Sequence, residues 1–202
     1  MIIAYNPALV CIAAGLASDN LMLAFYNGNG ISVNRQLPRL KRHSLPVSPN
    51  WIVVLVLLFL MENMVLIYGV GFGELTRLQL KGKEQLVAIA ILFGMGIRMF
   101  QDAKIKNRVA SLTTLNTKLC IETILGTSVY VFAFGCAMAW LKIDHSKVNL
   151  MLLPLLILSY LSGIVLGKYH FDKTFRYLNI ISALMMIAGS ILLTLEQLRN
   201  NL

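Results

Sequence analysis

Long apolar runs separated by short polar segments are the feature that most limits what this chain can fold into. The hydrocarbon core of a bilayer is about 30 Å thick, and a helix needs roughly 20 mainly apolar residues to cross it. Runs of about this length cover residues 4–26, 51–73, 84–102, 119–141, 148–166 and 175–195. Only 13% of the residues are charged, against about 25% in a soluble domain. The pattern predicts an all-α integral membrane protein with six transmembrane helices.

The Lys and Arg residues indicate an orientation in the membrane and not a nucleic-acid partner. The net charge of +9 comes mainly from short segments between the apolar runs, where basic residues orient helices. Most of these residues follow the first, third and fifth runs, as Arg39, Lys106 and Lys168 do. Cytoplasmic loops hold the excess of Lys and Arg. We therefore expect a multi-pass protein of the bacterial cytoplasmic (inner) membrane, embedded in the lipid bilayer, with both termini outside.

Two of the apolar runs contain a carboxylate next to an amide. Asp19 and Asn20 lie in the first run, and Glu62 and Asn63 lie near the middle of the second. A charged residue inside a membrane helix costs about 2.5 to 3.5 kcal/mol on insertion scales, and such residues usually serve transport. A carboxylate that is protonated and hydrogen-bonded across helices is the structural alternative. We favour function for Asp19 and Glu62, because both are costly and we expect them at a similar depth.

Other polar residues lie near the expected cytoplasmic mouth and in the fourth run. Arg98 and Asp102 are spaced so that they can form an ion pair on one helix face, and we favour this structural role. Glu122 falls in the first turn of its helix, where the helix dipole also stabilises an acid. Further candidates in the fourth run are Thr127, Ser128 and Tyr130.

The runs divide into two sets of three. Residues 1–103 hold the first three runs and residues 104–202 the last three. An odd number of spans in each half gives the halves opposite topology, and such inverted repeats place substrate sites where the halves meet near the midplane. Matching the halves sets Asp19 opposite Tyr130 and Glu62 opposite the apolar region around Leu156. We expect two inverted three-helix repeats, with the acidic chemistry in the first.

Glycines have two expected roles. The stretch Asn27 to Gly30, read NGNG, favours a turn and should end the first helix near Tyr26. Glycines within the runs let helix backbones approach closely. We expect this packing role at Gly69, Gly71, Gly73, Gly163 and Gly167.

Motifs in the first four runs resemble the bacterial manganese-efflux pumps of the MntP type, within the LysE transporter superfamily. That family has an Asp in a glycine-bounded stretch of its first helix, as in Gly15 to Gly28, and a Glu followed by spaced glycines in its second, as in Glu62 to Gly73. GIRMFQD, residues 96–102, is similar to the motif of its third helix. At the second Asp of the family's fourth helix this chain has Tyr130.

The resemblance implies export of Mn2+ from the cytoplasm, with the ion as substrate and no resident cofactor. Manganese prefers carboxylate, carbonyl, hydroxyl and water oxygens. The residues that offer or adjoin such oxygens are Asp19, Asn20, Glu62, Asn63, Thr127, Ser128 and Tyr130, with Asp102, Glu122 and Arg98 along the pathway. Protons could neutralise the carboxylates for the return step. Tyr130 in place of Asp removes one negative charge, so a different ion or a lost activity stays open.

Three other interpretations remain. An amino-acid exporter of the same superfamily would need a cation such as Arg98 facing the pathway. A non-transporting membrane subunit would fit the loss of the acid at Tyr130 and the apolar last two runs. An enzyme is not expected, because the sequence has no paired nucleophile and base and no phosphate-binding loop. The sequence leaves open whether the chain acts alone or as a homodimer.

Overall fold

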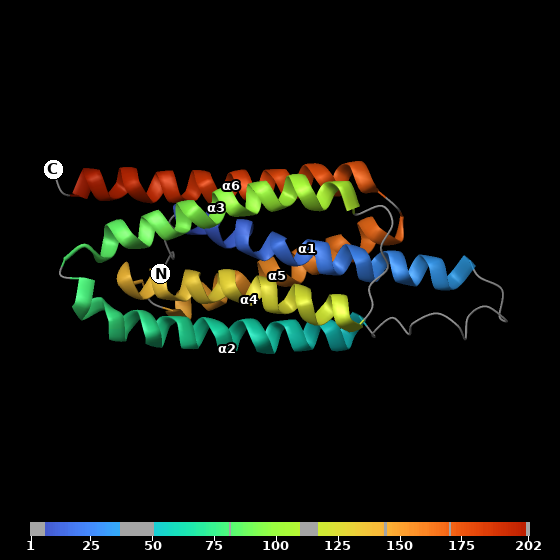
Figure 1. The fold of residues 1–202 in the computed structure, drawn as a ribbon, viewed down its shortest axis with the longest axis horizontal. Helices are drawn as coiled ribbons and strands as arrows, with labels where there is room; N and C mark the ends of the chain where they lie inside the picture. Colours follow the sequence, from blue (N-terminus) through green and yellow to red (C-terminus); the bar gives the residue numbers. More distant parts are fainter. Residues whose placement is uncertain are drawn as a thin grey trace, which may run out of the picture.

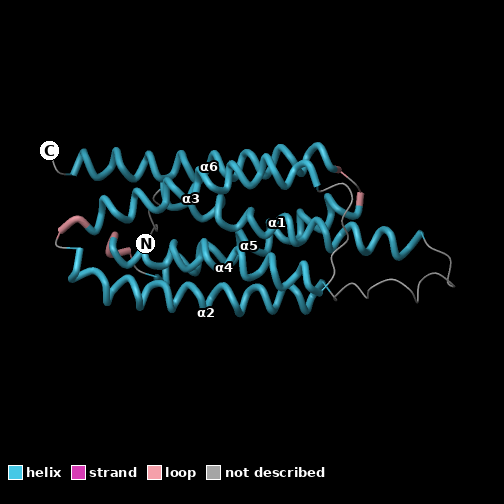
Figure 2. The backbone as a smooth tube through the Cα atoms, viewed as in Figure 1, coloured by secondary structure: helices cyan, strands magenta, loops and turns pink. Residues whose placement is uncertain are grey.

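The computed structural model describes residues 7–36, 51–80, 82–109, 117–143, 145–169 and 171–200, and these segments are all-helical. The elements are α1 (Pro7–Gln36), α2 (Trp51–Arg77), the 3-10 turn η2 (Leu78–Leu80), α3 (Glu84–Val109), α4 (Thr117–Trp140), α5 (His145–Lys168) and α6 (Asp172–Asn200). All six long helices run along one axis and form an elongated bundle (Figure 1). The helices alternate in direction, as the sequence colours of Figure 1 show, so α1 begins and α6 ends toward the same end of the bundle, where Figure 2 marks both ends of the chain.

Four helices contain segments that are long and apolar enough to cross a membrane: Pro7–Gly28, Ile52–Leu80, Glu84–Gln101 and Lys173–Glu196. The described parts of α4 and α5 contain shorter apolar segments, Ile124–Trp140 and Leu152–Lys168. The predicted all-helical fold is therefore confirmed for the described residues, and each of the six apolar runs lies largely within one helix.

The predicted end of the first helix was wrong. The helix does not stop at Tyr26 but continues as α1 through the NGNG stretch to Gln36. Gly28 is buried against α5, where a Cβ atom would come within 2.9 Å of the Lys168 nitrogen and closer still to the Ile164 carbonyl. The glycine thus serves close helix packing, which a local turn preference does not reveal. The rest of the predicted loop, residues 37–50, lies outside the described residues.

Glycines make the tightest helix contacts, between α1 and α5 and between α2 and α4. Gly163 of α5 lies against the backbone of Leu21 and the side chain of Ala24, both on α1. Gly69 of α2 lies against the backbone of Phe132 and Gly135, both on α4. Any Cβ atom at these glycines would overlap the neighbouring helix. These close contacts hold each pair of helices together along its length.

The predicted packing role of the other glycines is confirmed with one exception. Gly73 packs against Cys136 and Ala139 of α4, and Gly167 is buried near Gly28. Gly71 is exposed, and no atom of the described segments lies within 4 Å of a Cβ position there. Outside the helices, Gly82 has a φ of +83°, a conformation that glycine adopts without steric cost. It lies in the short connection from η2 to α3.

The apolar core consists of two clusters of buried residues. One cluster includes Leu16, Leu66 and Leu152 and extends over parts of all six helices. The other includes Leu58, Leu156 and Tyr160 and is centred on the second half of α1. Helix α6 packs against α1 and α3, and it contributes to both clusters.

Candidate functional site

A hydrogen bond between α1 and α2 forms the centre of the candidate site. Asn20 Nδ2 of α1 donates to Glu62 Oε1 of α2 at a donor–acceptor distance of 2.5 Å. Asn20 is 1% exposed, and its Oδ1 is buried with no hydrogen-bond partner among the described residues. A buried acceptor that lacks a partner costs about 1 to 3 kcal/mol. The amide therefore has an oxygen available for a hydrogen-bond donor or a cation.

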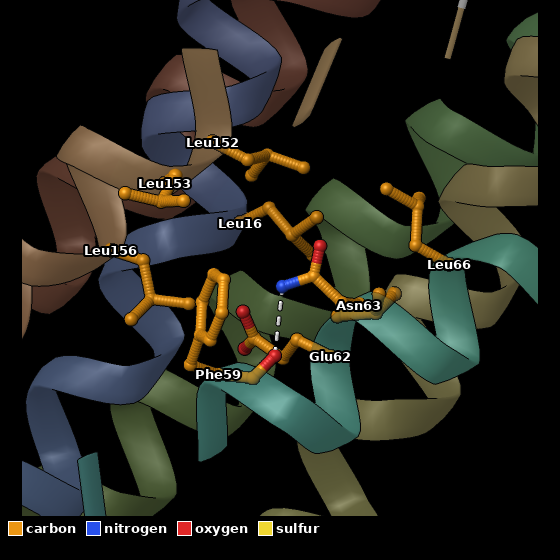
Figure 3. Close-up of a pocket in the computed structure, with 9 residues that line it drawn as sticks. Leu16, Phe59, Glu62, Asn63, Leu66, Leu152, Leu153 and Leu156 are labelled. Carbon is orange, nitrogen blue, oxygen red and sulfur yellow. Dashed lines mark hydrogen bonds between the residues drawn. The ribbon is translucent and has the colours of Figure 1, made fainter. Parts of the chain in front are cut away.

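Glu62 and Asn63 also line a cavity of about 20 Å³. Figure 3 shows their side chains extending from α2 toward leucines of α1 and α5. The other lining residues are Leu16, Phe59, Leu66, Val131, Leu152, Leu153 and Leu156. Leu153 is 38% exposed, so the lining reaches the side of the bundle. The cavity combines one carboxylate and one amide with mainly apolar walls, which strengthens electrostatic interactions within it.

The predicted hydroxyl and amide ligands have partners in their own helices. Asn63 Nδ2 donates to the Phe59 carbonyl at 2.8 Å, which leaves the amide oxygen as a potential ligand (Figure 3). Thr127 Oγ1 and Ser128 Oγ both donate to the Ile124 carbonyl, at 2.9 and 2.7 Å. A hydroxyl that donates its proton keeps lone pairs for a cation. Thr127 and Ser128 are buried in α4, whose Val131 lines the cavity.

Tyr130 and Arg98 lie together. The Tyr130 ring is buried in the core cluster that contains Leu16, and the Arg98 guanidinium carbon lies 5.9 Å from the ring centroid. This distance allows a cation–π interaction. The contact connects α3 to α4 at Tyr130, the residue that lies opposite Asp19 when the two halves of the sequence are matched.

Three predicted residues have side chains outside the described part of the structure: Asp19, Asp102 and Glu122. Their backbones belong to α1, α3 and α4, and Asp19 directly precedes Asn20. Because α4 begins at Thr117, Glu122 lies in its second turn, and the prediction that it falls in the first turn was wrong. The predicted pairing of Arg98 with Asp102 and the roles of these acids therefore stay predictions. Among the side chains that are described, no three His, Cys, Asp or Glu residues form a group that could hold a metal ion.

The structure also reveals a polar pair that the sequence did not single out. Asn27 Nδ2 of α1 donates to the Tyr160 hydroxyl of α5 at 3.2 Å, and both residues are 0% exposed. Within the part of the chain that the structure describes, Asn27 Oδ1 is buried without a hydrogen-bond partner, as Asn20 Oδ1 is. The two amides lie seven residues apart, which places them on one face of α1. The seven-residue spacing of Asn20 and Asn27 could have indicated this shared face. The NGNG stretch was predicted as a turn, so Asn27 was not considered as part of the helix.

Comparisons with known proteins give no relative for this chain: no family, no curated protein and no solved structure matches it.

Proposed function

We propose that this chain is a six-span membrane transporter that exports a divalent cation, Mn2+, from the cytoplasm. The observation that carries the proposal is the Glu62 carboxylate, which lines a mainly apolar cavity and accepts a hydrogen bond from buried Asn20 on another helix. A carboxylate at such a depth is costly unless it serves a purpose. Its oxygens are of the kind that Mn2+ prefers.

The arrangement of the helices supports two inverted repeats. In this scheme α1, α2 and α3 correspond to α4, α5 and α6. Under this correspondence α1 is equivalent to α4 and α5 is equivalent to α2. The close α1–α5 contact should therefore have an equivalent α4–α2 contact, and that contact is also close. The glycine contacts agree in register, since Gly163 packs on Leu21 and Ala24 as Gly69 packs on Phe132 and Gly135. The same register matches Asp19 with Tyr130 and Glu62 with Leu156.

A cation at this site would take oxygens from both halves. Glu62 supplies the described charge, and the amide oxygens of Asn20 and Asn63 supply neutral ligands. In the proposal Asp19 adds a second carboxylate, and the Thr127 and Ser128 hydroxyls approach when the helices rearrange. Protonation of Glu62 after release of the ion would neutralise it for the return step, with the Asn20 amide turned so that Oδ1 accepts the new proton.

The size of the cavity favours Mn2+ over Mg2+. A cavity of about 20 Å³ has room for about one water molecule. Mg2+ dehydrates reluctantly and usually keeps several waters, and a cavity of this size has no room for them. A transporter that requires its ion to lose nearly all of its water would therefore select against Mg2+, which competes with Mn2+ for the site.

The proposal is tested by manganese tolerance in a bacterial host that lacks its own manganese exporter. The parent chain, Asp19→Asn and Glu62→Gln are compared at equal membrane expression, and cellular Mn content and growth on excess Mn2+ are measured. We expect the parent to lower Mn content and restore growth and both variants to fail. No protection by a correctly inserted parent would contradict the manganese proposal. In that case amino-acid export or a non-transporting subunit would become the better interpretation.

A further inference from the structure

Buried residues flank Glu62 one helical turn away in each direction along α2. They are Leu58 on the side toward the start of α2 and Leu66 on the side toward its end. The facing helix α5 repeats the pattern around Leu156, with Leu152 before it and Tyr160 after it, both buried. Because α2 and α5 run in opposite directions (Figure 1), Leu66 and Leu152 lie toward one end of the bundle. Leu58 and Tyr160 lie toward the other.

The two pairs belong to different core clusters. Leu66 and Leu152 are in the cluster that extends toward the start of α1, and Leu58 and Tyr160 are in the cluster around the second half of α1. Both clusters reach the cavity, through Leu152 and through Leu156. The carboxylate therefore lies between two apolar layers. Constrictions of this kind block ions because they exclude water.

We propose that Leu66 with Leu152 forms the outer gate of the cation path and that Leu58 with Tyr160 forms the inner gate. This inference rests on the proposed transport function and on the expected orientation, in which the start of α1 and the end of α6 face outward. Each gate opens in turn while the other stays closed, so the cation at Glu62 is exposed to one side at a time.

The register of the proposed repeats relates the gates to each other. The match that sets Glu62 opposite Leu156 also sets Leu58 opposite Leu152 and Leu66 opposite Tyr160. Each inner-gate residue thus corresponds to an outer-gate residue of the other repeat: Leu58 to Leu152, and Tyr160 to Leu66. A pair of gates related by an axis through the binding site is the arrangement that alternating access between inverted repeats requires.

The inner gate has a polar latch. Asn27 donates to the Tyr160 hydroxyl at 3.2 Å, next to the tight contact between Gly28 and α5. The outer gate consists of two leucines and has no hydroxyl. We expect the latch to favour closure of the inner gate, because opening it would break a hydrogen bond within an apolar layer.

The gates are tested with a thiol probe at the cavity. Asn63→Cys is introduced into a full-length chain whose Cys11, Cys120 and Cys136 are replaced by Ala, and the protein is reconstituted in oriented lipid vesicles. A charged, membrane-impermeant thiol reagent is added to one side at a time. Outer-gate variants are Leu66→Ala and Leu152→Ala, inner-gate variants are Leu58→Ala and Tyr160→Phe, and Leu92→Ala is a buried control on α3.

We expect outer-gate variants to increase the labelling rate at position 63 about tenfold from the outside only, and inner-gate variants to do so from the inside only. Tyr160→Phe keeps the aromatic ring and removes the hydroxyl that accepts the hydrogen bond from Asn27. It therefore tests the inner gate without leaving a void in the core. Equal increases from both sides, or increases no larger than that of Leu92→Ala, would overturn the assignment. Labelling requires no transported ion, so Mn2+ flux in separate vesicles that hold the parent chain, with Asn63 intact, tests the cargo independently. Sided labelling without Mn2+ flux would keep the gates and reject manganese.

Discussion

The amide nitrogen of Asn20 lies 2.5 Å from a carboxylate oxygen of Glu62, and this hydrogen bond crosses between two tightly packed helix pairs. Asn20 belongs to α1, which packs closely on α5, and Glu62 belongs to α2, which packs closely on α4. Contacts made through glycine backbones resist sliding, because any shift brings backbone atoms into overlap. A motion that opens the cavity would therefore separate the pairs and leave each pair intact.

Replacing Asn20 with Leu should weaken Mn2+ binding. The change removes the amide that orients Glu62 and the buried Oδ1 that would ligate the ion. We expect the dissociation constant to rise about tenfold, which corresponds to about 1.4 kcal/mol. Titration of the purified protein with Mn2+ measures the change. Asn179→Leu makes the same chemical change on α6, and an equal loss of affinity in that variant would show that the effect is not local.

Two glycines on α2 should respond in opposite ways to a methyl group. In Gly69→Ala the new Cβ would overlap the Phe132 carbonyl and approach Gly135, so we expect a loss of about 1 to 3 kcal/mol in the free energy of unfolding. In Gly71→Ala the space is open, and we expect a gain of about 0.4 to 1 kcal/mol from reduced freedom of the unfolded chain. Unfolding in detergent measures both. Equal effects of the two substitutions would contradict the close α2–α4 contact.

Trp140 should contribute to the stability of the α2–α4 pair. Its Nε1 donates to the Gly73 carbonyl at 2.9 Å and approaches the Thr76 hydroxyl at 3.2 Å. Trp140→Phe should lower the free energy of unfolding by about 0.5 to 1.5 kcal/mol for the lost hydrogen bond, plus a contribution from the smaller ring. Thr76→Val keeps the Gly73 acceptor and should cost less. An unfolding midpoint for Trp140→Phe equal to that of the parent would disprove the contact.

Magnesium should compete poorly with manganese. The cavity of about 20 Å³ cannot hold an ion that keeps several waters. We therefore expect Mn2+ flux in vesicles to persist when Mg2+ is present in about a hundredfold excess. Inhibition by Mg2+ at concentrations comparable to Mn2+ would show that the ion passes with its water shell, through a wider opening.

The helices could be predicted from the sequence, but the end of α1 could not. Apolar runs define where a membrane helix can lie, so the starts of α2 and α3 agree with the predicted runs. The NGNG stretch has the local preference of a turn, yet Gly28 and Asn27 are held in the helix by contacts with α5. Such contacts depend on which helix is the neighbour, and a single sequence does not specify that.

The candidate site was predicted in part. Their place inside apolar runs identified Asn20 and Glu62, and the structure brings them into contact. Their cost in an apolar run is visible in the sequence, whereas the role of Leu66 or Leu152 is not, because a buried leucine looks the same beside a site as in any core. The hydrogen bond between Asn27 and Tyr160 could not be predicted, because the two residues lie on helices that are far apart in the chain.

Mn2+ transport by the purified protein in sealed lipid vesicles is the most direct test of Mn2+ export through a path that includes Glu62. Glu62→Gln removes the charge that lines the cavity, and Glu74→Gln makes the same change on the exposed side of the same helix. We expect Mn2+ flux in the parent and in Glu74→Gln and only background flux in Glu62→Gln. Equal flux in all three proteins would contradict a role for Glu62 in the pathway, and no flux in a folded parent would contradict manganese as the cargo.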